Sequence, residues 1–218
     1  MAGTTFFARA STGAGSEETL LAGNGVPRSL LDWSRDGRFL LYSEIDPKTK
    51  SDLWVLPMTP EKAGDARKPA PYLKTEFNEG EGRFSPDGRW IAYVSDESGK
   101  PEVYVQPFPF QSGAGRITVS NNGGSLPRWR RDGKELFYLG GNTRTIMSAA
   151  VTTTPSFTIG ATKNLFETPY TQMMAFTNLW DVAPDGSRFL FSTPAAVGNA
   201  SQPPLTVILN WTSLLSKQ

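Results

Sequence analysis

Four charged residues stand at one repeated spacing, each four positions before an Asp-Gly pair. They are Asp32, Arg83, Arg128 and Asp181, and the Asp-Gly pairs begin at Asp36, Asp87, Asp132 and Asp185. Two arginines brought together can form a fork for a carboxylate or a phosphate, because guanidinium groups bind such anions in a bidentate way. The alternative is that these four residues, the charged column, form salt bridges between neighbouring units, since buried charges are costly unless paired. The salt-bridge explanation is favoured. If the chain binds a ligand through these charges, the charged column is the candidate site.

Side chains that carry oxygen ligands gather in the segments just before these positions. The candidates are Asn78, Glu79, Glu81, Asn121, Asn122 and Asn178. Together with Asp32 or Asp181 they could hold Ca²⁺, which takes about six to eight oxygen ligands. Asn-Gly and Asn-Glu-Gly are also ordinary turn sequences, and that explanation is favoured. No cofactor is therefore expected. If the chain does bind a cofactor, the sequence favours calcium.

Much catalytic chemistry is excluded by composition. The chain contains no His and no Cys. Catalytic triads that use His, zinc sites that use His, and thiolate chemistry are therefore absent from this sequence. Any catalysis would depend on carboxylates, Tyr, Lys, Ser or a hard metal ion.

The elements that would position the charged column come from an internal repeat. Segments such as Ser85-Pro-Asp-Gly-Arg89, each followed by an apolar run, recur at intervals of 45 to 53 residues. Pro and Gly predict a tight hairpin turn, and alternating apolar residues on both sides predict short antiparallel strands. Four strands per ~45 residues predict an all-β propeller blade. The recurring Asp residues then build the turns, and core positions between blades are predicted for Trp33, Phe84, Trp90, Tyr93 and Trp129.

The repeat divides residues 1–218, as a single domain, into four blades at 27–75, 76–120, 121–167 and 168–218. Residues 1–26 hold two further strands, near 4–9 and 18–22, of an incomplete or ring-closing blade. These strands either complete the last blade or leave open ends that pair with a second copy, because unpaired strand edges invite association. The second alternative is favoured, so we predict a homodimer through open blade edges.

Charge and hydropathy restrict the partners. The chain has 22 Lys and Arg against 21 Asp and Glu, a net charge of +1, so no nucleic acid partner is expected. No apolar run is long enough to span a bilayer, and the first residues do not resemble a signal peptide. We expect a soluble chain without membrane insertion, and the sequence leaves its compartment open.

The repeated segment Phe84-Ser-Pro-Asp-Gly-Arg-Trp-Ile-Ala-Tyr93 resembles the WD40-like PD40 repeat of TolB-type propellers. Longer passages resemble the C-terminal propeller of bacterial eukaryotic-like serine/threonine kinases, among them Pro101-Glu-Val-Tyr-Val-Gln-Pro-Phe-Pro109 and Leu205-Thr-Val-Ile-Leu-Asn-Trp211. The resemblance implies a β-propeller with four PD40-type blades of four antiparallel strands and an N-terminal partial blade. The Gly-rich loop, His-Arg-Asp and Asp-Phe-Gly motifs of the kinase domain itself are absent from these residues.

The resemblance and the missing catalytic motifs together favour a non-catalytic sensor or scaffold. Such a module, part of a larger kinase-linked or TolB-like protein, would bind a protein, a peptide or a small ligand at the mouth of the propeller channel. The alternative is a calcium-assisted hydrolase of esters, lactones or phosphotriesters, in which a channel cation polarises the substrate without any His.

Overall fold

The computed structural model describes residues 3–13, 15–60, 67–110, 113, 115–141, 144–153, 156–168 and 180–192. All of the regular secondary structure in these residues is β-strand, which confirms the predicted all-β class. The described residues include no helix with the length and apolar character needed to cross a membrane.

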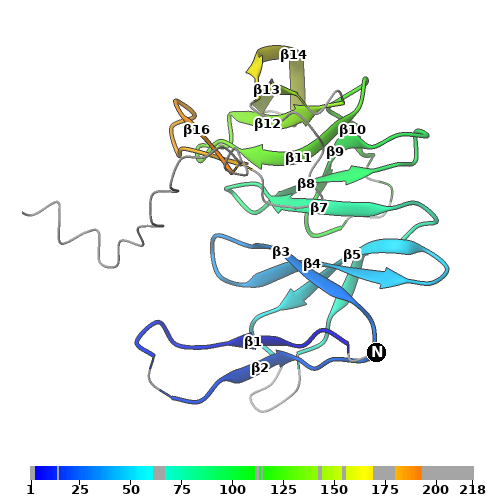
Figure 1. The fold of residues 1–218 in the computed structure, drawn as a ribbon, viewed down its shortest axis with the longest axis vertical. Coiled ribbons are helices and arrows are strands. Elements are labelled where there is room, and N and C mark those ends of the chain that lie inside the picture. Colours follow the sequence, from blue (N-terminus) through cyan, green and yellow to red (C-terminus); the bar gives the residue numbers. More distant parts are fainter. Residues whose placement is uncertain are drawn as a thin grey trace, which may run out of the picture.

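Five antiparallel sheets follow one another in chain order (Figure 1). The first blade consists of β3 (Arg28–Trp33), β4 (Phe39–Asp46), β5 (Lys50–Pro57) and β6 (Ala70–Leu73). The second consists of β7 (Glu79–Phe84), β8 (Trp90–Ser95), β9 (Glu102–Pro107) and β10 (Ile117–Thr118). The third consists of β11 (Gly124–Trp129), β12 (Glu135–Gly140), β13 (Thr145–Thr152) and β14 (Thr158–Glu167). The N-terminal pair, β1 (Phe6–Ala8) and β2 (Glu18–Leu21), precedes them, and the C-terminal pair, β15 (Trp180–Val182) and β16 (Phe189–Phe191), follows.

The sheets match the strand pattern that the repeat predicts. The three complete blades lie inside the ranges 27–75, 76–120 and 121–167, and the C-terminal pair supplies the first two strands of the range 168–218. Four-stranded antiparallel blades are thereby confirmed for the first three repeats. The segment 205–211, which carries part of the family resemblance, and the candidate ligand Asn178 lie outside the described residues.

The recurring Asp-Gly segments form the predicted hairpin turns. In the second blade, Gly88 donates its N–H to the Ser85 carbonyl at 2.8 Å and adopts a φ of 69°, a conformation that favours glycine. The Asp87 carboxylate accepts the Arg89 N–H at 3.1 Å and the Ser85 hydroxyl at 2.6 Å. The same Gly bond and positive φ recur at Gly37, Gly133 and Gly186. The turn aspartates therefore hold the hairpin loops, as their repetition predicts.

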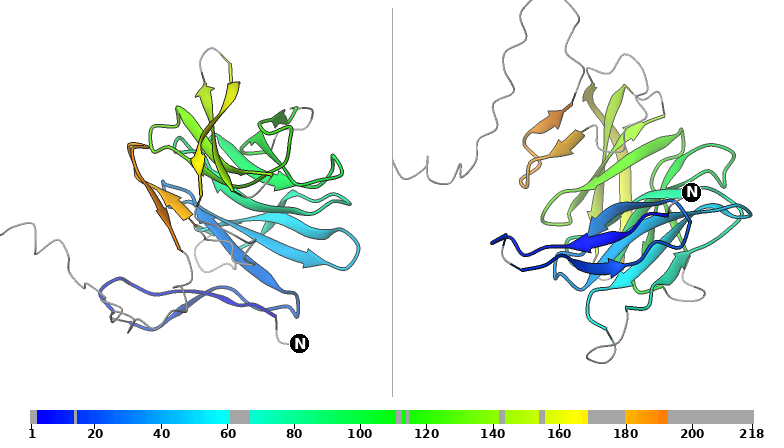
Figure 2. Two further views of the ribbon diagram at one scale, coloured as in Figure 1. Left: turned by 45° about the horizontal axis from the view of Figure 1, so that its top comes forward. Right: turned by 60° about the horizontal axis from the view of Figure 1, so that its bottom comes forward.

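Apolar cores lie between consecutive sheets. The joint between the first and second blades buries Leu41, Leu53, Ile91 and Tyr93, each at most 1% exposed. Further clusters join the N-terminal pair to the first blade, the second blade to the third, and the third blade to the C-terminal pair. Because each cluster belongs to two neighbouring sheets, the described sheets form one continuous series rather than separate units (Figure 2).

The two ends of this series carry short sheets. Within the described residues, β1 pairs only with β2, and β16 pairs only with β15. The N-terminal pair packs on the first blade through Phe6 and Leu20, which contact Leu40, Tyr42 and Leu56. None of the described core clusters joins the N-terminal pair to the C-terminal pair.

Candidate functional site

The first strand of each complete blade contains a β-bulge at the same place. Regular pairing is interrupted after Leu30 in β3, after Gly80 in β7 and after Ser125 in β11, and it resumes at Asp32, Arg83 and Arg128. Two non-glycine residues in these bulges have positive φ, Glu81 at 56° and Leu126 at 53°. A bulge bends its strand and changes the direction of the following side chain. Three members of the charged column thus follow directly after a bulge.

The bulged strands and the C-terminal pair surround a cavity of about 960 Å³. All four members of the charged column line it, although they come from four different sheets. The other lining residues are Leu31, Trp33, Arg35, Phe84, Ser85, Pro86, Trp129, Arg131, Trp180, Leu190, Phe191 and Ser192. The spacing in the sequence therefore identified residues that the fold brings together, and their role in binding stays a prediction.

Carboxylates of the first strands connect one blade to the next. Asp32 of β3 accepts the backbone N–H of Phe84 in β7 at 2.8 Å, and it also accepts the N–H of Trp33 at 2.9 Å. Glu81 of β7 accepts the N–H of Leu126 in β11. In each bond between the blades, a backbone N–H of one blade finds its acceptor in a carboxylate of the preceding blade. Asp32 thus joins two blades through a bond to a backbone N–H, and the favoured explanation of the column as salt bridges stays a prediction.

The two arginines of the column take a different arrangement. Arg128 donates to the carbonyl of Pro127 at 2.9 Å, and its guanidinium lies 5.7 Å from the centre of the Trp180 ring. Its Nε is 4.0 Å from an Asp181 carboxylate oxygen, which is the outer limit of an ion pair. Arg83 donates to the carbonyl of Gly82 at 3.4 Å. A backbone carbonyl therefore helps to orient each guanidinium group, and the face of Trp180 helps to orient that of Arg128.

Burial dominates the electrostatics of the cavity. Burial and the positive charge of Arg83 together lower the pKa of Arg128 to about 10, against the opposing effect of Asp181, Glu81 and Asp32. Burial also lowers the pKa of Arg83 and raises the pKa of Asp32. Each shift has the direction expected when a charged group loses water. Asp32, Arg83 and Arg128 are therefore partly desolvated, as ligand-binding charges often are, whereas Asp181 is mostly exposed.

Several lining residues were not predicted as site residues. Trp33 was predicted in the core between blades, but it is 51% exposed and lines the cavity. This prediction was wrong: within the described residues, the Trp33 side chain borders the cavity rather than a core between blades. Arg35 and Arg131 were also missed. Both stand one position before a turn Asp, and alignment of the repeats would have found them.

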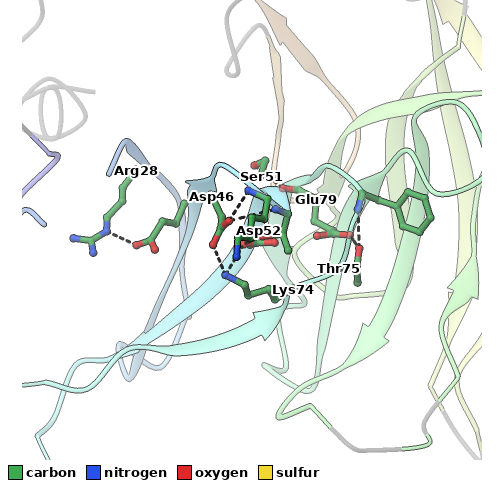
Figure 3. A network of polar contacts seen from close by, with 11 residues as sticks. Arg28, Asp46, Ser51, Asp52, Lys74, Thr75 and Glu79 are labelled. Atoms are coloured by element: carbon green, nitrogen blue, oxygen red, sulfur yellow. Dashed lines mark hydrogen bonds and ion pairs between the residues drawn. The ribbon is translucent and has the colours of Figure 1, made fainter. Parts of the chain in front are cut away.

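A second polar cluster lies at the joint between the first and second blades, away from the cavity lining (Figure 3). Lys74 points toward Asp46 and Asp52, with its Nζ 2.7 Å and 3.4 Å from their carboxylate oxygens. The Thr75 hydroxyl donates to Glu79 Oε1, and the Ser51 hydroxyl donates to the Glu79 carbonyl at 2.8 Å. Asp52 and Glu79 are both almost fully buried, and each has one carboxylate oxygen that finds no hydrogen-bond partner among the described residues.

The five predicted calcium ligands that the structure describes do not form one ligand set. The Asn78 amide donates to Asp96, while Glu79 and Glu81 take the partners given above. Asn121 and Asn122 are exposed and line a separate cavity of about 230 Å³ in the third blade. The described residues also include no group of three or more acidic side chains placed to hold a metal ion. The bonds at Asn78 and Glu81 are consistent with the turn and structural explanation.

Comparison with known proteins shows the fold. No family model matches the chain, and no curated protein matches it in sequence. TolB from Acinetobacter baumannii matches with a TM-score of 0.58 and 16% identity, covering 85% of this chain and 42% of that one. A protein assigned as TolB from Agrobacterium tumefaciens matches with a TM-score of 0.54 and 20% identity, covering 72% and 54%. The chain thus has a TolB-like propeller fold and spans about half the length of these solved relatives.

Proposed function

We propose that this chain is a non-catalytic binding module, a sensor or scaffold that recognises a protein, a peptide or a small ligand in the cavity between its blades. One observation carries the proposal. Four charged side chains from four different sheets, at equivalent positions of the repeat, line the same cavity of about 960 Å³. That volume lies within the range of about 300 to 1,000 Å³ found for ligand pockets. Membership of a larger kinase-linked or TolB-like protein is part of the same proposal and rests on the sequence resemblance.

The binding role is preferred to the calcium-assisted hydrolase for a reason of geometry. A hydrolase of that kind needs several oxygen ligands that converge on one cation. Asp32 and Glu81 instead accept backbone N–H groups of the next blade. A binding site requires no such convergence, and it can use the same residues as fixed walls.

A ligand screen with matched variants tests the proposal. Small molecules and tripeptides would be screened by ligand-observed NMR against the wild-type chain, Trp33→Ala and Phe7→Ala. Trp33 and Phe7 are similarly exposed, at 51% and 57%, but only Trp33 lines the cavity. We expect binders whose signals are lost with Trp33→Ala and retained with Phe7→Ala. Binders that ignore Trp33→Ala, or no binders at all, would contradict the proposal.

A second assay addresses catalysis. The purified chain would be mixed with esters, lactones and phosphotriesters in the presence of calcium. Turnover that survives Phe7→Ala but disappears with Asp181→Ala would show that the cavity is catalytic, and the non-catalytic proposal would then be wrong. No turnover above the buffer rate is the expected result.

A further inference from the structure

Two loops of the chain contain an asparagine followed directly by a glycine. Asn24-Gly25 lies between β2 and β3, and Asn122-Gly123 lies between β10 and β11. No other Asn-Gly pair occurs in the sequence. In such a pair, the backbone nitrogen of the glycine can attack the side-chain amide of the asparagine, because glycine has no side chain to hinder the approach and reaches many backbone conformations.

This reaction, deamidation, needs only the chain and water. The glycine nitrogen forms a bond to the asparagine Cγ, and the side-chain nitrogen leaves as ammonia, which takes up the proton that the glycine nitrogen gives up. Water then opens the resulting succinimide ring to give aspartate or isoaspartate, in which the main chain runs through the former side chain. Two local features favour the first step: a glycine nitrogen without another hydrogen bond, and a donor that faces the oxygen on which negative charge develops.

At Asn24, both features are present. The Asn24 side-chain oxygen accepts the N–H of Val26 at 3.1 Å, so a donor already faces the atom that becomes negatively charged during the attack. In the described part of the chain, the Gly25 N–H has no hydrogen-bond acceptor. Asn24 and Gly25 are both exposed, which gives water access for the second step. The loop therefore presents Asn24 in a reactive arrangement.

At Asn122, the glycine nitrogen is already engaged. Gly123 donates its N–H to Glu102 Oε1 at 2.8 Å, and Glu102 is only 2% exposed. This bond must break before the nitrogen can attack, and hydrogen bonds to charged groups are the stronger ones. We propose that Asn24 deamidates spontaneously in the folded chain, whereas Glu102 protects Asn122 from the same reaction.

The product at Asn24 would alter the connection between the N-terminal pair and the first blade. Thr4 donates its N–H to the Val26 carbonyl at 3.3 Å, and its hydroxyl accepts the Arg28 N–H at 3.1 Å. Isoaspartate at Asn24 adds a carbon atom to the main chain just before Val26, so it shifts Val26 relative to Thr4. We expect the modified chain to hold its N-terminal pair less firmly. Asn24 is not among the residues that line the cavity, so this inference is independent of the proposed function.

Two tryptic peptides of one sample test the inference. Residues 10–28 carry Asn24 and residues 117–128 carry Asn122. Mass spectrometry detects the replacement of an amide by a carboxylate in each peptide, and fragmentation assigns its position. The full chain would be incubated at neutral pH, both folded and in urea.

The two states of the chain give different expected rates. In urea, the two positions should react at similar rates, because both asparagines precede glycine. In the folded chain, Asn24 should react within about threefold of its rate in urea, and Asn122 should react at least about tenfold more slowly than in urea.

Matched variants test the two causes. Glu102→Ala removes the acceptor of the Gly123 N–H and should raise the rate at Asn122 at least about tenfold in the folded chain. The rate at Asn24 should not change. Asn24→Ser keeps a side-chain oxygen that can accept the Val26 N–H but contains no amide to lose. After equal incubation, Asn24→Ser should retain its midpoint of urea unfolding, whereas the midpoint of the wild-type chain should fall.

The outcomes decide each part of the inference. If Asn24 in the folded chain reacts more slowly than the threefold limit allows, the loop protects it and the inference is overturned. If the folded chain modifies Asn122 as fast as Asn24, the protection assigned to Glu102 is wrong. That comparison decides even if Glu102→Ala fails to fold. If the midpoint of incubated Asn24→Ser falls as far as that of the wild-type chain, the product does not loosen the N-terminal pair.

Discussion

Glu79 shows how strongly a single residue depends on its place in the repeat. The equivalent position of the third blade is Gly124, where an added Cβ would lie 2.6 Å from the Ser120 hydroxyl. There Ser120 donates to Glu102, whose other oxygen accepts the Gly123 N–H at 2.8 Å. In the preceding joint, Thr75 donates to Glu79 instead. That joint consequently buries two carboxylates where the next joint buries one.

This arrangement predicts a pH-dependent stability. Burial, together with the charge of Asp52, raises the pKa of Glu79 from 4.5 to about 7, against the opposing effect of the hydrogen bonds with Thr75. The folded chain therefore keeps this proton at pH values where the unfolded chain has lost it, so stability falls as pH rises from about 4.5 to about 7. Glu79→Gln should flatten this dependence and stabilise the chain by about 2 to 3 kcal/mol at pH 8. Urea unfolding at pH 5 and pH 8 measures it, with the exposed Glu76→Gln as control; a dependence that persists in Glu79→Gln would contradict the assignment.

At the scale of elements, the bonds between first strands hold the walls of the cavity. Asp32→Ala would leave the Phe84 N–H of the next blade without its acceptor, and a buried unsatisfied donor costs about 1 to 3 kcal/mol. Asp181→Ala, which removes a side chain that is 74% exposed, should change stability by less than about 0.5 kcal/mol. Chemical denaturation of both variants tests this. Equal losses would show that the bond to Phe84 contributes no special stability.

The bulge of β7 gives a second prediction for an element. A Cβ added at Gly82 would lie 2.6 Å from Leu41 Cδ2 in the core between the first and second blades, whereas a Cβ at Gly80 would meet nothing within 4 Å. Gly82→Ala should therefore destabilise the chain by about 1 to 3 kcal/mol through overpacking, and Gly80→Ala should be close to neutral. Thermal unfolding of the two variants compares two glycines of one strand. A neutral Gly82→Ala would mean that the joint relaxes easily.

The elements differ in how far the sequence predicts them. Hairpin turns such as Ser85-Pro-Asp-Gly88 are local, so Pro, Asp and Gly determine them directly. The charged column was found because a repeat places equivalent residues at equivalent points in space. The bulges were not predicted, because Glu81 and Leu126 carry no local signal for a positive φ and the extra residue depends on pairing with the next strand. Burial of Glu79 also depends on which side chains the neighbouring blade supplies.

At the scale of the whole molecule, the strand edges at the two ends of the series predict association. Within the described residues, β1 and β16 each have one strand partner, and unpaired edges invite association with another chain. We propose a homodimer through these edges, and light scattering should give twice the mass of the chain. Phe7→Lys on β1 should shift the mass toward the monomer, while Ile45→Lys on β4, a strand paired on both sides, should not. A monomeric wild-type chain would overturn this proposal.

The charged column also has a consequence for how such a chain can change over time. The turn residues that build each hairpin are nearly the same in every repeat, whereas the column reads Asp, Arg, Arg, Asp from the first repeat to the last. One position per blade thus determines the charge that the blade contributes to the cavity. A substitution at this position alters the charge of the cavity without altering the hairpin turn of the blade. Asp32 is the exception, because it also bonds to the next blade. Chains built on the same scaffold could therefore acquire new ligand preferences through single substitutions at the other three positions.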